Sequence, residues 1–402
     1  MKYIVVLIDG AADDRLEELG GKSPLEAAYM PTVRMLEKTA QIGLVQTVPE
    51  GMSPGSDIAN LSVMGYDPRI YHTGRSPLEA LSIGVKMKAH DIAIRLNLVT
   101  LSDETEFLDK RMLDYSGGEI PTDESALLMD ALIDAWKDEK DFEIHKGVSY
   151  RHLFLWHEGS MDISLVPPHN ITGERIMGHL PQGVHSDFFI RFIRKGYEIL
   201  KDHPVNQARI ARGERPANAP WLWGEGVRPS LVPFQGLYGL KAGVISAVDL
   251  IRGIARGADM EVLPVVGATG TIHTNFEGKG EAAVTGLNES LDYIYIHLEA
   301  TDECGHQGDI DGKVRSLELI DQHILKKLVE KVQGDYRLLL VPDHRTPLRT
   351  RKHDLVPVPY LLYDTRKTLG EGRGYNEEEA KGGTPLESGV ALHRLLIEKA
   401  MP

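Results

Sequence analysis

Three apolar segments that lie far apart in the chain each run into acidic residues. They are "YIVVLIDG" near the start of the chain, "DYIYIHLEATD" at residues 292–302 and "YRLLLVPDH" at residues 336–344. Uninterrupted apolar runs of this length are typical of strands that are buried on both faces of a parallel sheet. Ligands of open parallel α/β sheets gather at the carboxyl ends of the strands. We therefore expect both ends of the chain to build one sheet, with the acidic residues along a shared edge.

Helical patterns separate these expected strands. Residues 311–332, "DGKVRSLELIDQHILKKLVEKV", repeat apolar residues at helical spacing, which predicts one amphipathic helix. The segment "GVISAVDLIRGIARGADMEVLPVVG" is expected to form a helix followed by a further buried strand. The alternation of strands and helices predicts a doubly wound α/β core.

The middle of the chain has a different character. Residues 71–235 contain all four tryptophans and close with the Pro/Gly-rich segments "GERPANAPWLWGEGVRP" and "VPFQG". With 402 residues, the chain is also longer than a typical single core supports. We predict that residues 71–235 form a smaller inserted α/β domain, and that residues 1–70 and 236–402 form the two parts of one core.

Charge and cysteine content narrow the class of protein. A formal net charge of −14 argues against a nucleic-acid or membrane-surface binder, which needs a basic face. The single cysteine, Cys304, excludes an internal disulfide framework and suits a reducing compartment. The apolar run from Tyr3 to Ile8 is too short for a signal peptide or a membrane span. We expect a cytoplasmic protein with neither nucleic acid nor a membrane as its partner, and we leave its oligomeric state open.

Polar residues at the expected strand ends combine carboxylates with imidazoles. Such a mixture suits Mn²⁺, Zn²⁺, Co²⁺ or Fe²⁺ better than Mg²⁺ or Ca²⁺. Six ligands are too many for one tetrahedral ion and suit two ions that share a site. An aspartate at one strand end is more often a turn residue, so the metal prediction rests on the agreement of three strand ends. The candidate ligands are Asp9, Asp302, His306, Asp343, His344 and His353.

A serine follows a Pro-Gly turn in "SPGSDIANLSVMGYDP", residues 53–68. Ser56 stands directly before an apolar run at helical spacing, where its hydroxyl could cap the helix. A helix N-terminus also favours bound phosphate, so the same hydroxyl could act as a nucleophile. The local sequence leaves both interpretations open. Asp57 is interpreted as an ordinary first-turn residue.

Several motifs, in the same order along nearly the whole chain, resemble the cofactor-independent phosphoglycerate mutases of archaeal type. They are "IDGAAD", "PGSDIANLSVMGYDP", "GRSPLEA", "EATDECGH" and "PDHRTP", together with "DYSGGEI", "GVSYRH" and "PHNITG" in the expected insertion. That family belongs to the alkaline phosphatase superfamily of two-metal enzymes. The resemblance implies an alkaline-phosphatase-like core whose insertion is a substrate-binding lid. It also implies a glycolytic isomerase that interconverts 3- and 2-phosphoglycerate through a phosphoserine intermediate, without 2,3-bisphosphoglycerate.

The resemblance further implies roles for individual residues. Ser56 would accept the phosphoryl group. One ion would be bound by Asp9, Ser56, Asp343 and His344, and a second by Asp302, His306 and His353. Mn²⁺ is the expected metal, with Zn²⁺, Co²⁺ or Mg²⁺ as alternatives.

The lid would have to hold an anionic glycerate and exchange protons with it. Arginine matches the geometry of carboxylate and phosphate groups, although arginines on a surface are often simply solvated. The candidates for substrate binding are Arg95, Arg111 and Arg151, with Asp114 and His152 as possible proton carriers and Lys279 as a further cation.

Other functions remain open on the sequence. The segments "DYSGGEI", "SYRH" and "WLWGEG" are more similar to a bacterial branch of the family, whose members have been proposed as homoserine kinases of threonine biosynthesis. A metal-dependent phosphatase would result if water reached the phosphoserine. A metal-stabilised binding module without turnover is the alternative that is not an enzyme.

Overall fold

The computed structural model of the protein describes residues 1–398, which divide into two compact units. Within the described residues, unit 1 consists of 1–72 and 230–398, and unit 2 is Thr73–Pro229. The chain leaves unit 1 after residue 72 and returns at residue 230, whereas the sequence-based boundaries followed residues 70 and 235.

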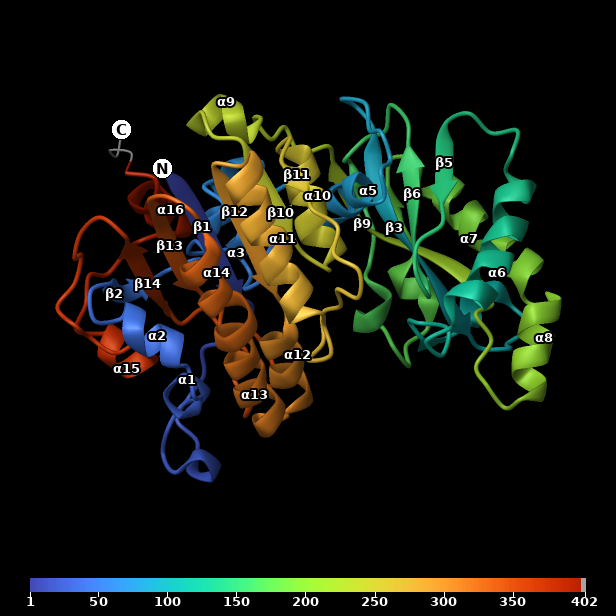
Figure 1. Cartoon of the computed structure of the whole chain (residues 1–402). Helices are drawn as coiled ribbons and strands as arrows, with labels where there is room; N and C mark the ends of the chain where they lie inside the picture. The colour runs from blue at the N-terminus through green and yellow to red at the C-terminus, as the bar shows by residue number, and fades with distance from the viewer. Residues whose placement is uncertain (399–402) are drawn as a thin grey trace. The chain divides into compact units, whose positions relative to one another are not determined.

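A seven-stranded sheet forms the centre of unit 1, with the strand order β11-β10-β12-β1-β13-β14-β2 (Figure 1). The strands are β1 Lys2–Ile8, β2 Gln41–Val45, β10 Ala242–Ile245, β11 Glu261–Val262, β12 Tyr293–Leu298, β13 Tyr336–Val341 and β14 Val358–Asp364. β1 pairs in parallel with β12 on one side and with β13 on the other, while β14 is antiparallel to β13 and to β2. The three apolar segments are therefore adjacent central strands, and their carboxyl ends meet at one edge, as predicted.

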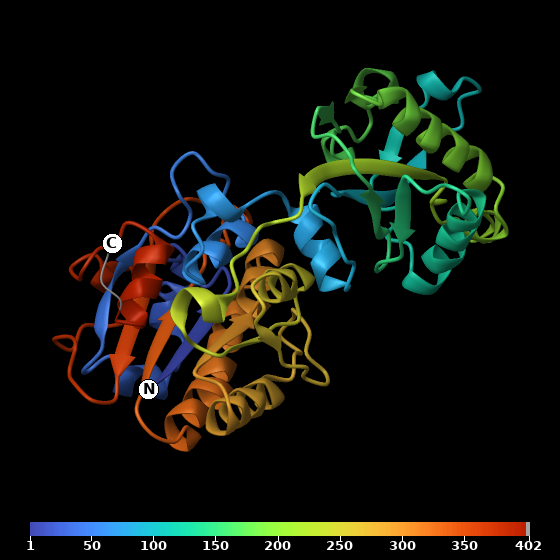
Figure 2. The ribbon, with the colours of Figure 1, turned by 90° about the horizontal axis from the view of Figure 1, so that it is seen from above.

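Helices cover both faces of this sheet (Figure 2). On one face, Ile4 of β1 belongs to the same buried cluster as Leu287 and Leu317, which lie on α11 and α13. On the other face, Tyr293 of β12 contacts Phe234 of α9, with ring centroids 4.7 Å apart. The helices of unit 1 are α1 Pro24–Ala27, α2 Pro31–Leu36, α3 Ser56–Val63, α4 Pro68–Tyr71, α9 Phe234–Tyr238, α10 Asp249–Gly257, α11 Phe276–Glu289, α12 Ala300–Gln307, α13 Ile310–Ile320, α14 Lys326–Lys331, α15 Glu377–Ala380 and α16 Gly389–Leu396. Among residues 1–398, none of the helices combines the length and apolarity that crossing a bilayer requires.

Two local predictions for unit 1 need correction. The helix expected over 311–332 contains a π-helical turn, Asp321–Leu325, between α13 and α14. In this turn, the buried Asp321 carboxylate accepts hydrogen bonds from the N–H groups of Thr32 and Val33, at 3.1 and 2.9 Å, and so caps α2. The second correction concerns the segment that starts with "GVISAVDL", which was expected to form a helix followed by a strand. It begins with a further strand, β10, which pairs with β12.

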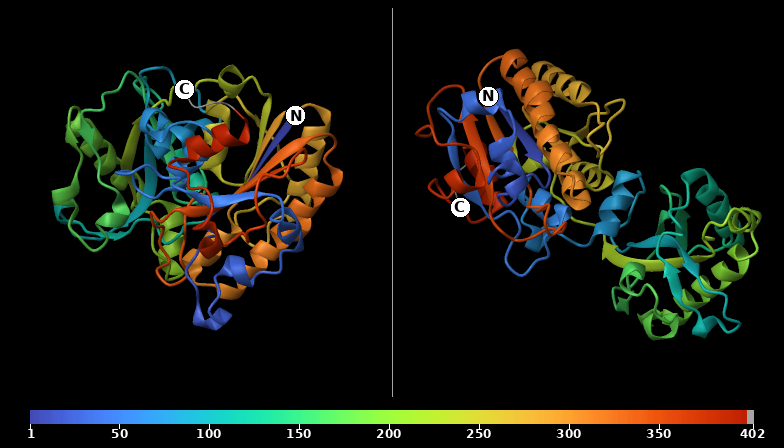
Figure 3. Two further views of the ribbon diagram at one scale, coloured as in Figure 1. Left: turned by 90° about the vertical axis from the view of Figure 1, so that its left-hand side faces the viewer. Right: turned by 90° about the horizontal axis from the view of Figure 1, so that it is seen from below.

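Unit 2 is built on an antiparallel sheet in which β3 is central (Figure 3). Its strands are β3 Ile92–Leu101, β4 Met112–Asp114, β5 Phe142–His145, β6 Arg151–Trp156 and β9 Ala219–Val227, with the separate hairpin β7 Ile163–Ser164 and β8 Gln182–Gly183. Its helices are α5 Arg75–Ser82, α6 Thr122–Ala135, α7 Ser186–Leu200 and α8 Pro204–Ala211. Phe189 and Phe192 of α7 pack with Phe154 of β6 on one face, and Ala80 of α5 packs with Ala93 of β3 on the other.

The two ends of the insertion are held together within unit 2. The Thr73 hydroxyl donates a hydrogen bond to the Val227 carbonyl at 2.7 Å, two residues before the unit ends. Unit 1 has a matching contact, in which the Tyr66 hydroxyl donates to the Val232 carbonyl at 2.8 Å. In each unit, therefore, the segments at which the chain departs and returns lie side by side.

Candidate metal centre

Two carboxylates and an imidazole meet at the carboxyl ends of β1 and β13. Asp9 directly follows β1, and Asp343 and His344 follow β13. The Asp343 Oδ1 atom accepts hydrogen bonds from the N–H groups of Gly10 and His344, at 3.2 and 2.9 Å. His344 Nε2 lies 3.5 Å from Asp9 Oδ1 and 3.4 Å from Asp343 Oδ2. One ligand atom from each of the three residues lies within 4.8 Å of the others, and all three side chains are buried. We call Asp9, Asp343 and His344 the first group.

A second group joins the first through His344. It consists of Asp302, His344 and His353, again with ligand atoms within 4.8 Å of one another. His353 Nε2 lies 3.3 Å from Asp302 Oδ1, and His306 Nε2 lies 3.3 Å from Asp302 Oδ2. As predicted from their spacing, Asp302 and His306 lie one turn apart on the same side of α12. The structure thus brings together all six predicted ligand residues, with His344 between the two groups.

Ser56 lies beside the first group, but its helix begins differently from the prediction. The N-cap residue of α3 is Gly55, and Ser56 is the first residue inside the helix, so Ser56 does not cap it. Its hydroxyl oxygen instead lies 3.1 Å from His344 Nε2. Asp57 is also more than an ordinary first-turn residue, because its buried carboxylate lies 2.8 Å from the His72 Nε2 atom. A helical start at residue 56 aims the serine hydroxyl at the imidazole.

The charges of the two groups are only partly balanced by the protein. Burial and the neighbouring Asp343 and Asp302 carboxylates raise the pKa of Asp9 well above its usual value. Burial also acts to raise the pKa of Asp302, but hydrogen bonds with His306 and His353 hold it well below its usual value. The hydrogen bond between Asp302 and His306 raises the pKa of His306 to about 9. Clustered carboxylates with this electrostatic cost favour a bound cation.

The residues present fit divalent ions. Asp9 Oδ1 is a buried oxygen with no hydrogen-bond partner among residues 1–398, and it faces His344 Nε2. Burying such an oxygen costs free energy unless a hydrogen-bond donor or a cation binds it. Mixed carboxylate and imidazole ligands suit Mn²⁺, Co²⁺ or Zn²⁺ better than a cation that prefers oxygen alone.

Sequence reasoning missed the side chains that hold these groups in place. Asn60 donates from Nδ2 to the Ser56 carbonyl at 2.8 Å and to Asp343 Oδ2 at 3.0 Å, and it accepts at 2.6 Å from the Tyr295 hydroxyl. His297 lies 3.0 Å from Asp9 Oδ2, and the Thr346 hydroxyl donates to Asp302. Asn60 could have been found, because it follows Ser56 by one helical turn. His297 is a lone histidine within the apolar run "YIYIHL", and that run alone does not indicate which strand lies next to it.

Five of the six predicted substrate-binding residues lie in unit 2, and most of them already have partners there. Arg95 pairs with Glu79 and stacks over Trp223, with Cζ 4.6 Å from the ring centroid. Asp114 accepts from the Ser116 N–H at 2.7 Å and pairs with Arg215 at 2.8 Å. Both side chains are therefore largely engaged inside unit 2.

The remaining three residues of unit 2 differ in exposure. Arg111 donates to the Gly173 carbonyl at 3.0 Å, and Arg151 stacks over Tyr150 at 4.8 Å; both arginines are exposed. His152 is 5% exposed, and burial lowers its pKa to about 3. Because a buried neutral ring cannot exchange protons readily near pH 7, this environment disfavours the predicted role of His152 as a proton carrier.

Lys279, the sixth candidate, belongs to unit 1. It lies on α11 with its side chain buried, and its ammonium group donates to the Thr269 carbonyl at 3.4 Å. Burial lowers the pKa of Lys279 to about 8, although the Glu299 carboxylate acts in the opposite direction. Burial together with the nearby Glu303 and Asp302 carboxylates raises the pKa of Glu299 to about 7. Lys279 is thus a buried cation in the unit that carries the two groups.

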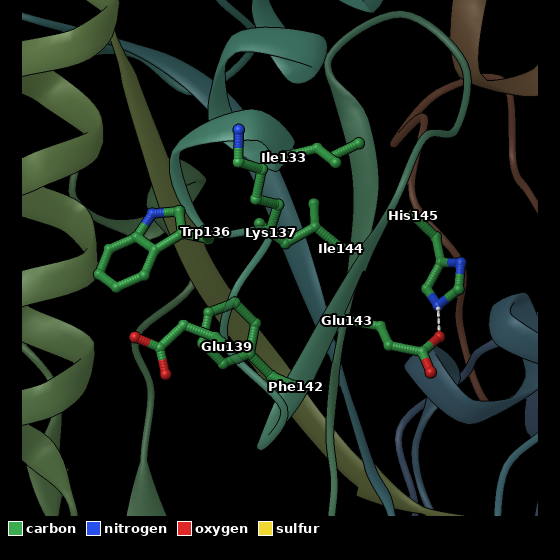
Figure 4. Close-up of a pocket in the computed structure, with 8 residues that line it drawn as sticks. All are labelled: Ile133, Trp136, Lys137, Glu139, Phe142, Glu143, Ile144 and His145. Atoms are coloured by element: carbon green, nitrogen blue, oxygen red, sulfur yellow. Dashed lines mark ion pairs between the residues drawn. The ribbon is translucent and has the colours of Figure 1, made fainter.

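A pocket of about 280 Å³ lies elsewhere, between the end of α6 and β5 in unit 2 (Figure 4). It contains an apolar wall and the Glu143–His145 ion pair of 2.9 Å. None of the predicted site residues lines it. Its lining residues are Ile133, Trp136, Lys137, Glu139, Phe142, Glu143, Ile144 and His145.

Comparison with known proteins gives a consistent set of relatives. A family model described as 2,3-bisphosphoglycerate-independent phosphoglycerate mutase matches residues 38–206. A probable mutase of this kind from Geobacter sulfurreducens is 44% identical over 99% of this chain and 100% of its own length. The corresponding enzyme of Methanosarcina barkeri is 41% identical over 96% of each chain.

Two solved structures share the fold. A protein from Pyrococcus horikoshii superposes with a TM-score of 0.83 and 25% identity over 100% of this chain and 98% of its own. The cofactor-independent phosphoglycerate mutase of Thermoplasma acidophilum gives a TM-score of 0.69 with 23% identity over 99% of each chain.

Proposed function

Because the chain belongs to the 2,3-bisphosphoglycerate-independent phosphoglycerate mutase family, we propose that it interconverts 3- and 2-phosphoglycerate without 2,3-bisphosphoglycerate. The observation that carries this proposal is the position of the Ser56 hydroxyl, 3.1 Å from His344 Nε2 and beside the first group. A nucleophile at the start of a helix, next to a cluster that suits cations, favours phosphoryl transfer through a phosphoserine.

In the proposed reaction, the Ser56 oxygen attacks the phosphorus of 3-phosphoglycerate. The bond between this oxygen and phosphorus forms as the bond to the 3-oxygen of glycerate breaks. The departing oxygen takes up one proton, and the serine hydroxyl gives up one, so the step is balanced. In the second step the 2-oxygen of glycerate loses its proton and bonds to phosphorus, the bond between phosphorus and the Ser56 oxygen breaks, and that oxygen takes up one proton.

Two divalent ions, Mn²⁺ by preference, are proposed for the two groups. Bound there, they would stabilise the negative charge of the transferred phosphoryl group and favour loss of the serine proton. Asp9, Asp343 and His344 would hold one ion beside Ser56, and Asp302, His306 and His353 would hold the other. The protein's own contribution is to fix the serine: α3 begins at Ser56, and Asn60 bonds both the Ser56 carbonyl and Asp343.

Unit 2 is proposed to be the lid that keeps glycerate bound between the two transfers. Arg111 and Arg151 support this role, because their guanidinium groups are exposed and match a carboxylate or phosphate. Arg95 and Asp114 would shape the surface rather than carry free charge, since both are already paired. The glycolytic substrate and the free Cys304 support a cytoplasmic location.

The homoserine kinase alternative is not favoured. The relatives that match nearly the whole chain are named as mutases. A phosphatase would share the phosphoserine step and differ in its acceptor, so the products of the reaction distinguish the two.

A coupled mutase assay with Mn²⁺ tests the proposal. We expect conversion of 3- to 2-phosphoglycerate without added 2,3-bisphosphoglycerate, loss of this activity in EDTA, and no ATP-dependent phosphorylation of homoserine. Ser56→Ala should lower kcat by roughly 10⁴-fold or more. Ser62→Ala is the matched control, because Ser62 lies on the same helix and its buried hydroxyl has no hydrogen-bond partner among residues 1–398.

Three results would contradict the proposal. They are activity that requires 2,3-bisphosphoglycerate and survives EDTA, release of inorganic phosphate as the main product, and a Ser56→Ala variant as active as Ser62→Ala.

A further inference from the structure

His297 is a polar residue inside an otherwise apolar central strand. It belongs to β12, a strand between β10 and β1 (Figure 1). All six residues of β12 are buried. His297 is 1% exposed. In the strand register its partner is Leu7 of β1, which precedes Asp9 by two residues. A buried imidazole must satisfy its hydrogen bonds within the protein, because an unpaired polar group there is costly.

The two ring nitrogens of His297 have different partners. Nε2 lies 3.0 Å from Asp9 Oδ2, and Nδ1 lies 3.3 Å from the Ser246 hydroxyl. A carboxylate that binds a cation is ionised and can only accept a hydrogen bond, so Nε2 carries the hydrogen and donates it when Asp9 acts as a ligand. The Ser246 oxygen accepts from the Val248 N–H at 3.0 Å, which leaves the serine hydrogen for Nδ1. Ser246 can thus donate to Nδ1 and stabilise the tautomer in which Nε2 donates to Asp9.

This contact satisfies only one of the two oxygens of the Asp9 carboxylate by a hydrogen bond. Oδ2 accepts from His297, whereas Oδ1 is buried with no hydrogen-bond partner among residues 1–398. Oδ1 is also the oxygen that lies 3.5 Å from His344 Nε2. Asp343 differs, because two backbone N–H groups and Asn60 hold its carboxylate. The orientation of Asp9 therefore depends on a side chain from the neighbouring strand.

We propose that His297, itself held by Ser246, is a positioning residue. It turns Asp9 Oδ1 toward Asp343 and His344 and so raises the affinity of the first group for a divalent cation. The inference rests on the metal site of the proposed function. His297 would act through Asp9 and would touch neither substrate nor cation. Residues that orient a metal ligand in this way typically change metal affinity by about 10- to 100-fold when they are removed.

Calorimetric titration of the full chain with Mn²⁺, after removal of metal by EDTA and dialysis, tests the inference. His297→Phe fills the same space without a donor and should weaken one of the Mn²⁺ binding events by about 10- to 100-fold. His297→Gln retains an amide donor and should recover most of the affinity. Ser246→Ala frees the ring tautomer and should weaken binding by a smaller factor, about 2- to 5-fold.

The matched control is His393→Phe. His393 is another fully buried histidine of unit 1, and its ring lies 4.7 Å from that of Tyr238. Replacing it removes a buried imidazole without touching Asp9, so Mn²⁺ affinity should stay at the wild-type value. Far-UV circular dichroism of each variant in EDTA verifies that it is folded.

Each outcome separates this inference from the proposed function. If the wild-type chain binds no Mn²⁺, the proposed metal site fails. If the wild type binds Mn²⁺ and folded His297→Phe binds it equally well, the metal site stands and the role of His297 is refuted. Should His297→Phe not fold, Ser246→Ala decides, and wild-type affinity in that variant overturns the inference. Equal weakening in His297→Gln and His297→Phe would also overturn it, because the donor would then be irrelevant.

Discussion

Replacing Lys313 by Met removes one half of an ion pair that is completely buried in unit 1. The Lys313 ammonium group on α13 donates to Asp13 Oδ2 at 2.7 Å and to the Thr346 carbonyl at 2.9 Å. Both side chains of the pair are 0% exposed. Methionine keeps most of the aliphatic stem, so the change isolates the loss of the charge and its two hydrogen bonds.

The expected loss of stability is large. Removing one partner from a buried ion pair costs about 3–5 kcal/mol, because an uncompensated charge is left behind. Asp13 still accepts from the Leu348 N–H at 3.1 Å, which favours the lower half of that range. The unpaired Thr346 carbonyl adds about 1 kcal/mol. We therefore expect Lys313→Met to lower the free energy of unfolding of unit 1 by about 4–5 kcal/mol, against a typical total of about 5–15 kcal/mol.

Urea denaturation in EDTA, followed by two signals, measures this loss. All four tryptophans of the chain, at positions 136, 156, 221 and 223, belong to unit 2, so tryptophan emission reports on that unit. Far-UV circular dichroism reports on both units. Lys313→Met should lower the urea midpoint of unit 1, which is seen in the dichroism signal. The midpoint of unit 2, which is seen in tryptophan emission, should stay the same. Adding Asp13→Asn should recover at least about 1 kcal/mol, because the buried charge disappears.

Lys327→Met provides the matched control. Lys327 is 7% exposed, but its partners Glu277 and Glu281 are 54% and 61% exposed. Pairs with solvated carboxylates contribute about 0–1 kcal/mol. If Lys313→Met costs no more than Lys327→Met, the argument that burial makes this pair critical is wrong.

The remaining predictions concern pH, positioning and substrate binding. Burial lowers the pKa of His152 from 6.5 to about 3, so below pH 6.5 the unfolded chain takes up a proton that the folded unit 2 refuses, and stability falls by up to about 1.4 kcal/mol per pH unit. His152→Phe should flatten this decline in urea midpoints measured by tryptophan emission at pH 7 and pH 5, and parallel declines in the two proteins would refute the assignment. Asn60→Ala should lower kcat by about 10- to 100-fold without changing the dichroism spectrum, since it releases Asp343 from its amide donor; unchanged kcat would exclude a positioning role. Arg151→Met should raise KM for phosphoglycerate about tenfold or more, whereas Arg175→Met, at another exposed arginine of unit 2, should not; equal KM values in the two variants would argue against the proposed lid role of Arg151.

The residues that the sequence indicated are those for which local pattern and general topology agree. Asp9 and Asp343 follow uninterrupted apolar strands, and parallel strands place their carboxyl ends at the same edge of a sheet whatever the strand order. Asp302 and His306 needed only the spacing of a helical turn. The shared edge of these side chains was therefore predictable, whereas their close approach also depends on β12, β1 and β13 being adjacent.

The contacts behind those residues depend on information that no short segment carries. Lys313 and Asp13 lie 300 positions apart, and His297 meets Asp9 because β12 happens to be the neighbour of β1. The start of α3 was misjudged for a related reason: a serine after Pro-Gly normally caps a helix, but here its hydroxyl is directed to His344 and Gly55 takes the N-cap position. In each case a tertiary partner decided between conformations that the local sequence allows equally.

The joined ends of the insertion have an evolutionary and practical consequence. Since Thr73 bonds Val227 within unit 2, and Tyr66 bonds Val232 within unit 1, the inserted segment occupies the place of a short surface loop. Loops of this kind accept long additions at small entropic expense. Insertions of different size and specificity could thus be accommodated at this position without a change in the strand pairing of the sheet or in its cluster of carboxylates and imidazoles. A chain in which residues 72 and 230 are linked by a few glycines is the natural minimal scaffold for asking what the cluster does alone.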